Sequence, residues 1–268
     1  GSMCYEERVL FRLLSGMHAS INIHIAKRYK PPMKGKRADW EPNPKHFFRQ
    51  YSKHPEYLKN LHFSFVVLLR ALRKAAPVLW DYDYTMGLEE DDRTVRLVRR
   101  VLDTHLLQRC ADVFEAFDES LMFAPMHEGS TFPSTMTNLK ANFKSVFQKI
   151  GSILDCVTCQ KCKLHGKLSL MGIGTALKIL LLPESMLSTA FHRSEVVALF
   201  NTLGKFSEAI ESIGPLMHQY WDDMKAAEGS RGQGASPVGG AAPAPTLKQG
   251  LELVDAAVGA VAGLAQSG

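Results

Sequence analysis

The sequence contains no run of about 18 consecutive apolar residues, which is the length that a membrane-spanning helix needs. The first residues, Gly1-Ser2-Met3, are not followed by the hydrophobic core of a secretory signal. No alternation of apolar and polar residues is long enough to predict a strand. These absences predict an all-α chain without a membrane span. The Gly-Ser-Met start directly before a helical pattern is typical of a fragment, and we expect one here.

A strong charge of one sign is also missing. The chain has 32 basic and 27 acidic residues and a formal net charge of +5, which is too small to indicate a nucleic-acid partner. Four arginines (93, 96, 99 and 100) do line a predicted helix over residues 93–108. Because no aromatic residues interleave with them and no nucleic-acid module is recognisable, we predict no nucleic-acid binding. The hydrophobic fraction of 46% suits a globular protein of 268 residues.

Apolar residues at spacings of three and four predict the helices. They indicate helices over 6–29, 56–77, 93–108 and 139–155, one from 168 interrupted at Gly172-Ile173-Gly174, and one capped by Ser194 that ends at Gly214-Pro215. Residues 30–46, 78–91 and 109–138 are predicted to be irregular, the last after a short helix. The basic run from Lys27 to Arg37 is interpreted as a solvated loop.

The end of the chain differs in composition from the rest. Residues 226–245 are rich in Gly, Ala, Pro and Ser and are typical of a linker, and residues 247–264 form at most a weak amphipathic helix. We therefore predict a single all-α helical bundle over residues 4–225 and a disordered tail over residues 226–268.

The cysteines are few, odd in number and unevenly placed. Of the five, Cys4 and Cys110 stand alone, whereas Cys156, Cys159 and Cys162 follow one another at strict three-residue spacing. An odd count leaves at least one thiol without a partner inside the chain. A fragment that has lost pairing cysteines would show this pattern.

Three chemistries compete for the cysteine cluster. A structural zinc site could use Cys156, Cys159, Cys162 and His165, but on one continuous helix these ligands would form a poor tetrahedral cage. An iron–sulfur cluster would use the same three cysteines, although the usual fourth cysteine followed by proline is missing. These two interpretations remain open from spacing alone, as does a structural disulfide.

The third chemistry is a redox disulfide between Cys159 and Cys162, which form a Cys-x-x-Cys motif. The neighbouring Lys161, Lys163 and His165 would lower the pKa of a thiol and favour the thiolate. Such a disulfide needs an electron acceptor, and no dinucleotide-binding fingerprint is present because no strand precedes the glycines at 172 and 174. A helical bundle could instead hold a flavin between its helices.

Three polar residues stand in or beside apolar helix faces. Ser15 and His18 lie three apart and share one face of the first helix. Taken locally, His18 is more typical of a core or edge histidine than of a ligand, and Arg70 near the end of its helix is more typical of a side chain that reaches to solvent. The alternative for Arg70 is contact with an anion.

Several segments together resemble the endoplasmic reticulum oxidoreductins, the Ero-type thiol oxidases. Residues 155–168 (DCVTCQKCKLHGKL) and 172–180 (GIGTALKIL) resemble the inner active-site region of that family. The other matching segments, in consistent order, are 4–10 (CYEERVL), 14–21 (LSGMHASI), 59–61 (KNL), 69–72 (LRAL) and 195–201 (EVVALFN). The resemblance spans residues 4 to 213, and the chain is similar to the C-terminal portion of the family.

The resemblance implies a helical, FAD-dependent thiol oxidase. Such an enzyme takes electrons from protein disulfide isomerase and passes them to molecular oxygen, and it acts in the lumen of the endoplasmic reticulum, peripheral to the membrane. Cys159 and Cys162 match the inner Cys-x-x-Cys pair; the match implies that Cys162 lies next to the flavin and attacks it as a thiolate, and that Cys159 exchanges with an outer shuttle pair. Ser15, His18 and Arg70 match residues that contact FAD, and no metal is implied.

The chain also departs from the family pattern. Tyr57 stands where the family has another arginine that contacts FAD. The outer shuttle pair belongs to an N-terminal half that this chain does not contain. Cys4 and Cys156 match cysteines that pair structurally with partners in that half. The alternative function, from a different class, is a non-enzymatic helical binding module that is stabilised by zinc at Cys156–His165.

Overall fold

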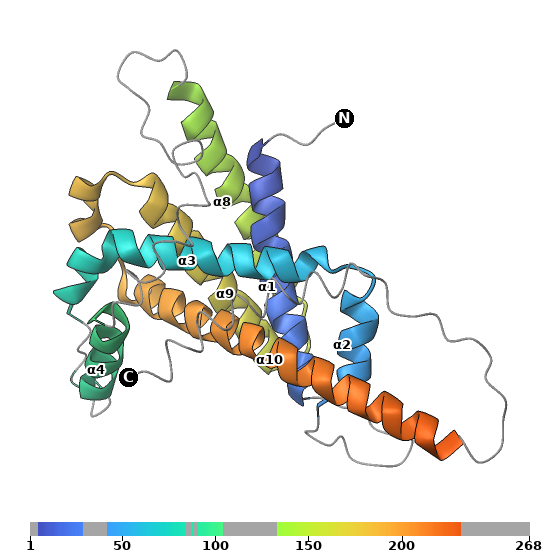
Figure 1. Ribbon diagram of the computed structural model, residues 1–268. Helices are drawn as coiled ribbons and strands as arrows, with labels where there is room; N and C mark the ends of the chain where they lie inside the picture. Colours follow the sequence, from blue (N-terminus) through green and yellow to red (C-terminus); the bar gives the residue numbers. More distant parts are fainter. Residues whose placement is uncertain (1–4, 29–41, 84–86, 88–90, 104–132, 232–268) are drawn as a thin grey trace. The chain divides into compact units, whose positions relative to one another are not determined.

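The computed structural model describes residues 5–28, 42–83, 87, 91–103 and 133–231, and every regular element within these ranges is a helix (Figure 1). The predicted all-α class is confirmed. In chain order the helices are α1 (Tyr5–Arg28), α2 (Pro44–Tyr51), α3 (Glu56–Trp80), α4 (Asp91–Asp103), α8 (Pro133–Asp155), α9 (Gln160–Leu181), the short 3-10 helix η1 (Glu184–Thr189) and α10 (Arg193–Arg231).

The chain divides into two compact units. Unit 1 comprises Gly1–Leu13 and Phe63–Gly204, and unit 2 comprises Leu14–His62 and Lys205–Gly268. The long helices α1, α3 and α10 each contribute one stretch to each unit. The units are therefore not consecutive domains along the sequence.

Unit 1 is organised around α9. A side chain at Gly172 would place its Cβ 2.1 Å from Thr202 Oγ1 and 2.6 Å from the Ala198 carbonyl oxygen, so only glycine allows α9 and α10 to approach so closely. The Thr202 hydroxyl lies 3.0 Å from the Leu168 carbonyl of α9 and 2.7 Å from the Ala198 carbonyl of its own helix. Buried side chains surround this contact, among them Ile173, Ala176, Leu180, Val196, Leu199 and Leu203.

The C-terminal end of α9 is held by a cation. Lys74 of α3 donates from Nζ to the carbonyl oxygens of Leu180 at 3.0 Å and Leu182 at 2.6 Å. These are carbonyls that a helix leaves without an intrahelical partner. A positive charge at this end also interacts favourably with the negative end of the helix dipole. Desolvation lowers the pKa of Lys74, whereas Glu184 raises it.

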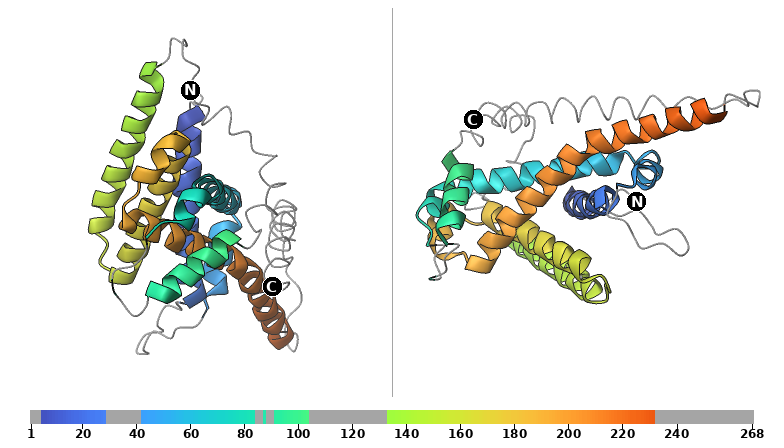
Figure 2. Two further views of the ribbon diagram at one scale, coloured as in Figure 1. Left: turned by 90° about the vertical axis from the view of Figure 1, so that its left-hand side faces the viewer. Right: turned by 90° about the horizontal axis from the view of Figure 1, so that it is seen from below.

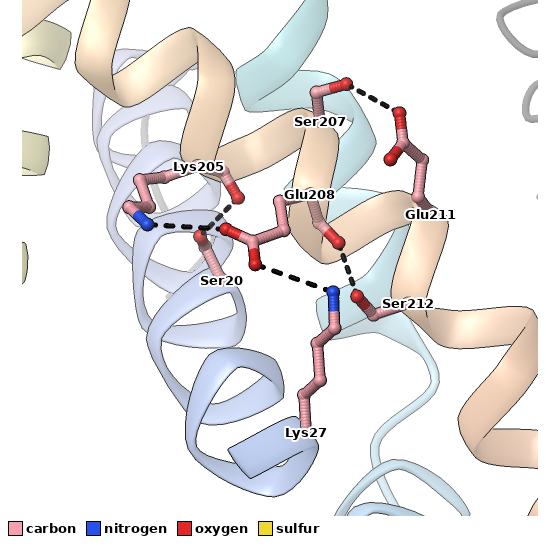
Figure 3. Close-up of polar contacts among 7 residues, drawn as sticks. All are labelled: Ser20, Lys27, Lys205, Ser207, Glu208, Glu211 and Ser212. Carbon is pink, nitrogen blue, oxygen red and sulfur yellow. Dashed lines mark hydrogen bonds and ion pairs between the residues drawn. The ribbon is translucent and has the colours of Figure 1, made fainter.

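Unit 2 is held by a polar seam between α1 and residues 205–231 of α10 (Figure 3). Glu208 of α10 accepts from Lys27 of α1 at 3.4 Å and from Lys205 at 3.3 Å, and the Ser20 hydroxyl donates to the Lys205 carbonyl at 3.5 Å. These polar groups flank a buried apolar face that includes Met17, Ile23, Phe206, Ile210 and Ile213. The Tyr51 hydroxyl of α2 donates to the Ala19 carbonyl at 3.1 Å and ties a third helix to this unit.

The helix α2 was not expected from the sequence. The Asn43 side chain accepts from the His46 backbone N–H at 3.0 Å, and Pro44 occupies the first helical turn. Asparagine before proline is a helix-start signal, because the amide caps the free N–H groups and proline needs no donor there. Its short length and few periodic apolar residues explain why it was missed: its first residues fall in the predicted 30–46 loop, and residues 47–51 were given no assignment.

Several predicted helix ends are wrong. The helix α3 continues past Pro77 to Trp80, and α10 continues past Gly214-Pro215 to Arg231. Both prolines are exposed, whereas Leu79, Leu216 and Met217 on the other faces are buried. Tertiary burial therefore outweighs the backbone hydrogen bond that each proline removes.

Other boundaries differ for local reasons. The glycines at 172 and 174 do not interrupt α9. Close packing against α10 favours glycine at 172, whereas an added Cβ at 174 would make only ordinary contact with Phe147. The helix α10 starts at Arg193, so Ser194 is not its cap; instead the Glu195 carboxylate accepts from the His192 backbone N–H at 2.9 Å, as in a capping box. The helix α8 starts at Pro133, inside the predicted 109–138 loop.

Some expectations lie outside the described residues. They are the loop and basic run at 29–41, the end of the arginine-bearing helix beyond Asp103, the short helix after residue 108, and the tail from residue 232. Residues 226–231, which were assigned to the linker, continue α10. The proposed division at residue 225 stays a prediction.

One described helix, α9, is long and apolar enough to cross a membrane by length and composition. However, 61% of its most apolar window is buried within the protein. This is typical of the core helix of a globular domain, and it agrees with the central place of α9 in unit 1.

We expect Gly172→Ala to lower the free energy of unfolding by about 1–3 kcal/mol, because the added methyl group meets the backbone of Ala198. The matched control is Gly174→Ala, whose Cβ would lie 3.7 Å from Phe147 in ordinary contact. The control should be neutral or gain up to about 1 kcal/mol from helix propensity. Urea unfolding of the two variants measures the difference, and equal midpoints would contradict the packing described.

Candidate redox site

The three clustered cysteines lie at the connection between α8 and α9. These two helices run side by side as a hairpin in unit 1, with residues 156–159 joining them (Figures 1 and 2). A Cβ at Gly166 would lie 2.8 Å from Leu154, so glycine allows the helices to pack closely just below the connection. An ion pair between Asp155 and Lys167 joins the helices at the same level. The connection is therefore held at its base.

Cys159 caps the N-terminus of α9. Its backbone is extended, with φ −70° and ψ 106°, and its Sγ accepts from the Cys162 backbone N–H at 3.3 Å. Its carbonyl accepts from the Lys163 N–H at 2.8 Å. The sulfur takes the place of the oxygen that Ser, Thr, Asp or Asn would supply. The first turn of a helix favours negative charge, so this position favours a thiolate.

The two thiols of the motif differ in acidity. The pKa of Cys159 is lowered, first by a hydrogen bond from the Cys162 side chain, then by the Cys162 backbone N–H and the Lys161 charge. Burial raises the pKa of Cys162 to about 11, with further contributions from Cys159. In the reduced pair the thiolate therefore forms on Cys159 first, and Cys162 holds the proton. This order is the reverse of the thiolate at Cys162 that the family resemblance implies.

Cys156 has a different environment. It is exposed at the end of α8, and its Sγ lies 3.8 Å from the Ser152 carbonyl. Within the described ranges, no three His, Cys, Asp or Glu side chains gather in a group that could hold a metal. The zinc alternative needs Cys156, Cys159, Cys162 and His165 around one ion, and the described residues do not show that arrangement.

One face of α9 continues from the thiol pair into the core. Cys162, His165 and Ser169 follow at intervals of three and four, so they share a face. Ser169 is 1% exposed, and its hydroxyl has no hydrogen-bond partner among the described residues. A buried hydroxyl without a partner is destabilising. A polar ligand group beside this face would satisfy it, which fits a bound cofactor.

Ser15 and His18 lie on the part of α1 that belongs to unit 2. The Ser15 hydroxyl accepts from the Asn60 side-chain amide of α3 at 2.7 Å. The His18 ring is exposed, with its Nδ1 3.1 Å from the Asn22 amide nitrogen, and partial desolvation lowers its pKa. A lowered pKa keeps the imidazole neutral near pH 7. Ser15 and His18 can thus offer neutral hydrogen-bonding groups.

Arg70 is half-buried on α3 within unit 1, between the buried residues Leu69 and Ala71. Cys159 and Cys162 belong to the same unit. The structure thus brings the two proposed redox cysteines into direct contact and joins Ser15 to Asn60.

Sequence reasoning missed two partners of these residues. Asn60 was noted as part of a motif but not as the donor to Ser15, because 45 residues separate the two. Asn22 stands four residues after His18, so helical spacing could have indicated that contact. The capping role of Cys159 was missed because the predicted helix begins only at residue 168, whereas α9 begins at Gln160, and because cysteine is an uncommon cap.

The fold and the thiol pair point to one class of protein, the helical thiol oxidoreductins. Residues 1–213 match the model of the family described as Endoplasmic Reticulum Oxidoreductin 1 (ERO1). The chain belongs to this family.

Two relatives show the extent of the similarity. The chain is 35% identical over 235 residues to the Drosophila melanogaster Ero1-like protein, covering 78% of this chain and 46% of the relative. It is 34% identical over 218 residues to Arabidopsis thaliana Endoplasmic reticulum oxidoreductin-1, covering 80% and 44%. The chain thus spans about half the length of the curated relatives it matches.

Solved structures agree. A double cysteine-to-alanine mutant of S. cerevisiae Ero1p is similar with a TM-score of 0.63 and 27% identity, covering 82% of this chain and 58% of that one. A second structure, of Ero1p as "Source of Disulfide Bonds for Oxidative Protein Folding in the Cell", is similar with a TM-score of 0.61 and 29% identity, covering 81% and 57%.

In the reduced protein we expect iodoacetamide to modify Cys159 before Cys162 at pH 7, because only Cys159 has a lowered pKa. Cys162→Ala should raise the pKa of Cys159, since it removes the hydrogen bond that lowers it most. The pH dependence of alkylation, followed by peptide mass spectrometry, measures both effects. Cys156→Ala is the control and should leave the profile of Cys159 unchanged. A faster reaction at Cys162 than at Cys159 would contradict this order of acidity.

Proposed function

We propose that this chain carries the inner redox centre of a FAD-dependent thiol oxidase that acts in the lumen of the endoplasmic reticulum, peripheral to the membrane. Its donor would be protein disulfide isomerase and its acceptor molecular oxygen. The observation that carries the proposal is the contact between Cys159 and Cys162 at the start of a buried helix, with opposite shifts of pKa. Family membership supplies the reaction class.

The exchange of thiols and disulfides can be followed on these two residues. A donor thiolate attacks the exposed Sγ of Cys159, the Cys159–Cys162 bond breaks, and Cys162 leaves and takes up a proton. The second donor thiol then attacks the donor sulfur of the mixed disulfide and releases Cys159 as a thiolate. The donor gains a disulfide, and the electron pair resides in the reduced Cys159 and Cys162.

The protein holds the reduced pair in a defined state. The Cys162 backbone N–H and the N-terminus of α9 stabilise the Cys159 thiolate, and the Cys162 thiol donates to it. The chemistry that FAD supplies when bound is acceptance of this electron pair and its transfer to oxygen, which yields hydrogen peroxide. Ser15, His18 and Arg70 are the residues proposed to hold it.

The available groups fit such a cofactor. The Ser15 hydroxyl and a neutral His18 ring suit the amide and hydroxyl groups of a flavin nucleotide, and the Arg70 guanidinium suits a phosphate. The Ser169 hydroxyl, which has no hydrogen-bond partner in the described part of the chain and lies on the Cys162 face of α9, is a further group that a polar ligand would satisfy. Tyr57 in place of a cationic side chain removes one expected contact, which predicts weaker binding than in the family.

We expect Cys159→Ala and Cys162→Ala each to abolish oxygen consumption by the FAD-loaded chain, because neither single thiol can form or release the disulfide. Oxygen uptake is followed with reduced protein disulfide isomerase and, separately, with dithiothreitol, which can reach the exposed Cys159 directly. Cys156→Ser is the control and should retain activity. Undiminished uptake in either alanine variant would refute the assigned role.

Removal of the His18 ring should weaken FAD binding by about tenfold, the effect of losing one hydrogen bond of about 1–1.5 kcal/mol. Binding is measured by flavin fluorescence on titration of the purified chain, with His18→Ala compared to His218→Ala. His218 is an exposed histidine on α10 outside the matched segments. Equal affinity in the two variants would remove His18 from the site.

A further inference from the structure

A hollow lies in unit 2, between α2 and the C-terminal part of α10. Its volume is about 360 Å³, and it is open to solvent. The lining consists of Lys45, Phe48, Arg49, Ser52, Lys53, Tyr220 and Met224. None of the proposed redox or FAD-binding residues lines it.

The charged residues in the described lining of this hollow are all basic. Lys45, Arg49 and Lys53 recur every fourth residue along α2 and the residues that follow it, so they lie along one side. All three are exposed, and none of them forms an ion pair with a described residue; Arg49 Nη2 lies 3.5 Å from His46 Nδ1. None of the described residues that line the hollow carries a carboxylate. Three cations therefore face the hollow without a counter-charge among these lining residues.

Aromatic rings fix the contact between α2 and α10 beside the hollow. The rings of Phe48 and Tyr220 stack with centroids 4.0 Å apart and an interplanar angle of 8°. Trp221 meets Phe48 edge-on at 5.7 Å and Tyr220 at 5.3 Å. Stacked and edge-on pairs of this kind hold the two helices together. Lys45 and Arg49 are thus carried on a helix whose position against α10 is set by packing, and Lys53 follows just after the end of that helix.

From these contacts we propose that the hollow binds a phosphate group, either of a soluble phosphate ester or of a phospholipid headgroup. Arginine and lysine form charge-assisted hydrogen bonds with phosphate oxygens, and arginine does so through two parallel N–H groups. Ser52 and Tyr220 line the same space, and a hydroxyl of either residue is a donor for a further phosphate oxygen. Asp222 and Asp223, although close in sequence, do not line it.

This site lies partly outside what the family match describes. The match ends at residue 213, and the lining residues Tyr220 and Met224, together with Trp221, which packs on Phe48, come after it. The cations come from α2 and the residues just after it, inside the matched range. The hollow therefore joins a matched helix to a stretch of α10 beyond the match.

The test compares two probes on the purified full chain. Isothermal titration with inorganic pyrophosphate measures a soluble phosphate, and co-sedimentation with vesicles of phosphatidylcholine, with and without phosphatidic acid, measures a lipid phosphate. We expect saturable binding to pyrophosphate, to the phosphatidic acid vesicles, or to both. Binding to the vesicles alone assigns a lipid source, and binding to pyrophosphate assigns a soluble ester. Binding should weaken as salt concentration rises, because exposed charges are screened.

The decisive variant removes the three cations together: Lys45→Gln, Arg49→Gln and Lys53→Gln. At about fivefold for each cation near an anionic surface, affinity should fall by about a hundredfold. The control removes the same charge from exposed residues of unit 1, with Lys144→Gln, Lys149→Gln and Arg100→Gln, and should keep the affinity within about threefold of the parent. Because all six side chains are exposed, circular dichroism should show unchanged helix content.

Two results would overturn the proposal. One is that the chain binds neither pyrophosphate nor the phosphatidic acid vesicles. The other is an equal loss of affinity in the hollow variant and the charge-matched control, since net charge alone would then explain the binding. Neither result bears on the thiol oxidase, whose readout is oxygen consumption.

Discussion

The close approach of α9 and α10 at Gly172 is the constraint on which unit 1 depends. The missing side chain lets the Thr202 hydroxyl reach the Leu168 carbonyl at 3.0 Å, and the helices then bury the apolar residues around this contact. Protein cores are packed at crystal-like density, so a contact of this kind leaves little freedom to shift one helix along the other. The position of α9 is therefore fixed well inside the molecule, at a distance from the thiols.

That fixed helix explains how an exposed connection can hold a precise redox pair. Cys159 is the residue before the first turn of α9, and Cys162 lies within that turn, so the backbone sets their separation. The Gly166 contact with Leu154 and the pair between Asp155 and Lys167 hold the end of α8 against the same turn. The exposed ion pair adds little stability by itself, about 0–1 kcal/mol. The packing of the Leu154 side chain at Gly166 is a second constraint.

The sequence predicted the parts of this arrangement that depend on local pattern. The stripes at spacings of three and four located α1, α3, α8 and α10, and the Cys-x-x-Cys motif located the redox pair. Prediction failed where tertiary contacts decide the outcome. Pro77 and Pro215 do not end their helices, because buried neighbours continue the pattern.

The chemistry of the site shows the same limit. Spacing placed lysines near both cysteines, but it could not show that Cys162 would be half-buried and Cys159 exposed. The contact of Ser15 with Asn60, which are 45 residues apart, depends on the pairing of α1 and α3. Burial and long-range pairing of this kind are properties of the folded chain, which a single sequence does not display.

Access and acidity act on the two sulfurs in a way that gives the exchange a direction. Access favours attack at the exposed Cys159, which makes Cys162 the first leaving group. Because Cys162 is partly buried, it leaves more slowly as a thiolate than it would if it took up a proton. In the second exchange Cys159 leaves, and its lowered pKa speeds this departure. Part of the shift at Cys162 arises from the Cys159 thiolate and is absent while Cys159 is bonded to the donor. Burial, the largest cause of the raised pKa of Cys162, persists there and keeps this thiol protonated, so its return attack is slow and the mixed disulfide is resolved toward release of the oxidised donor.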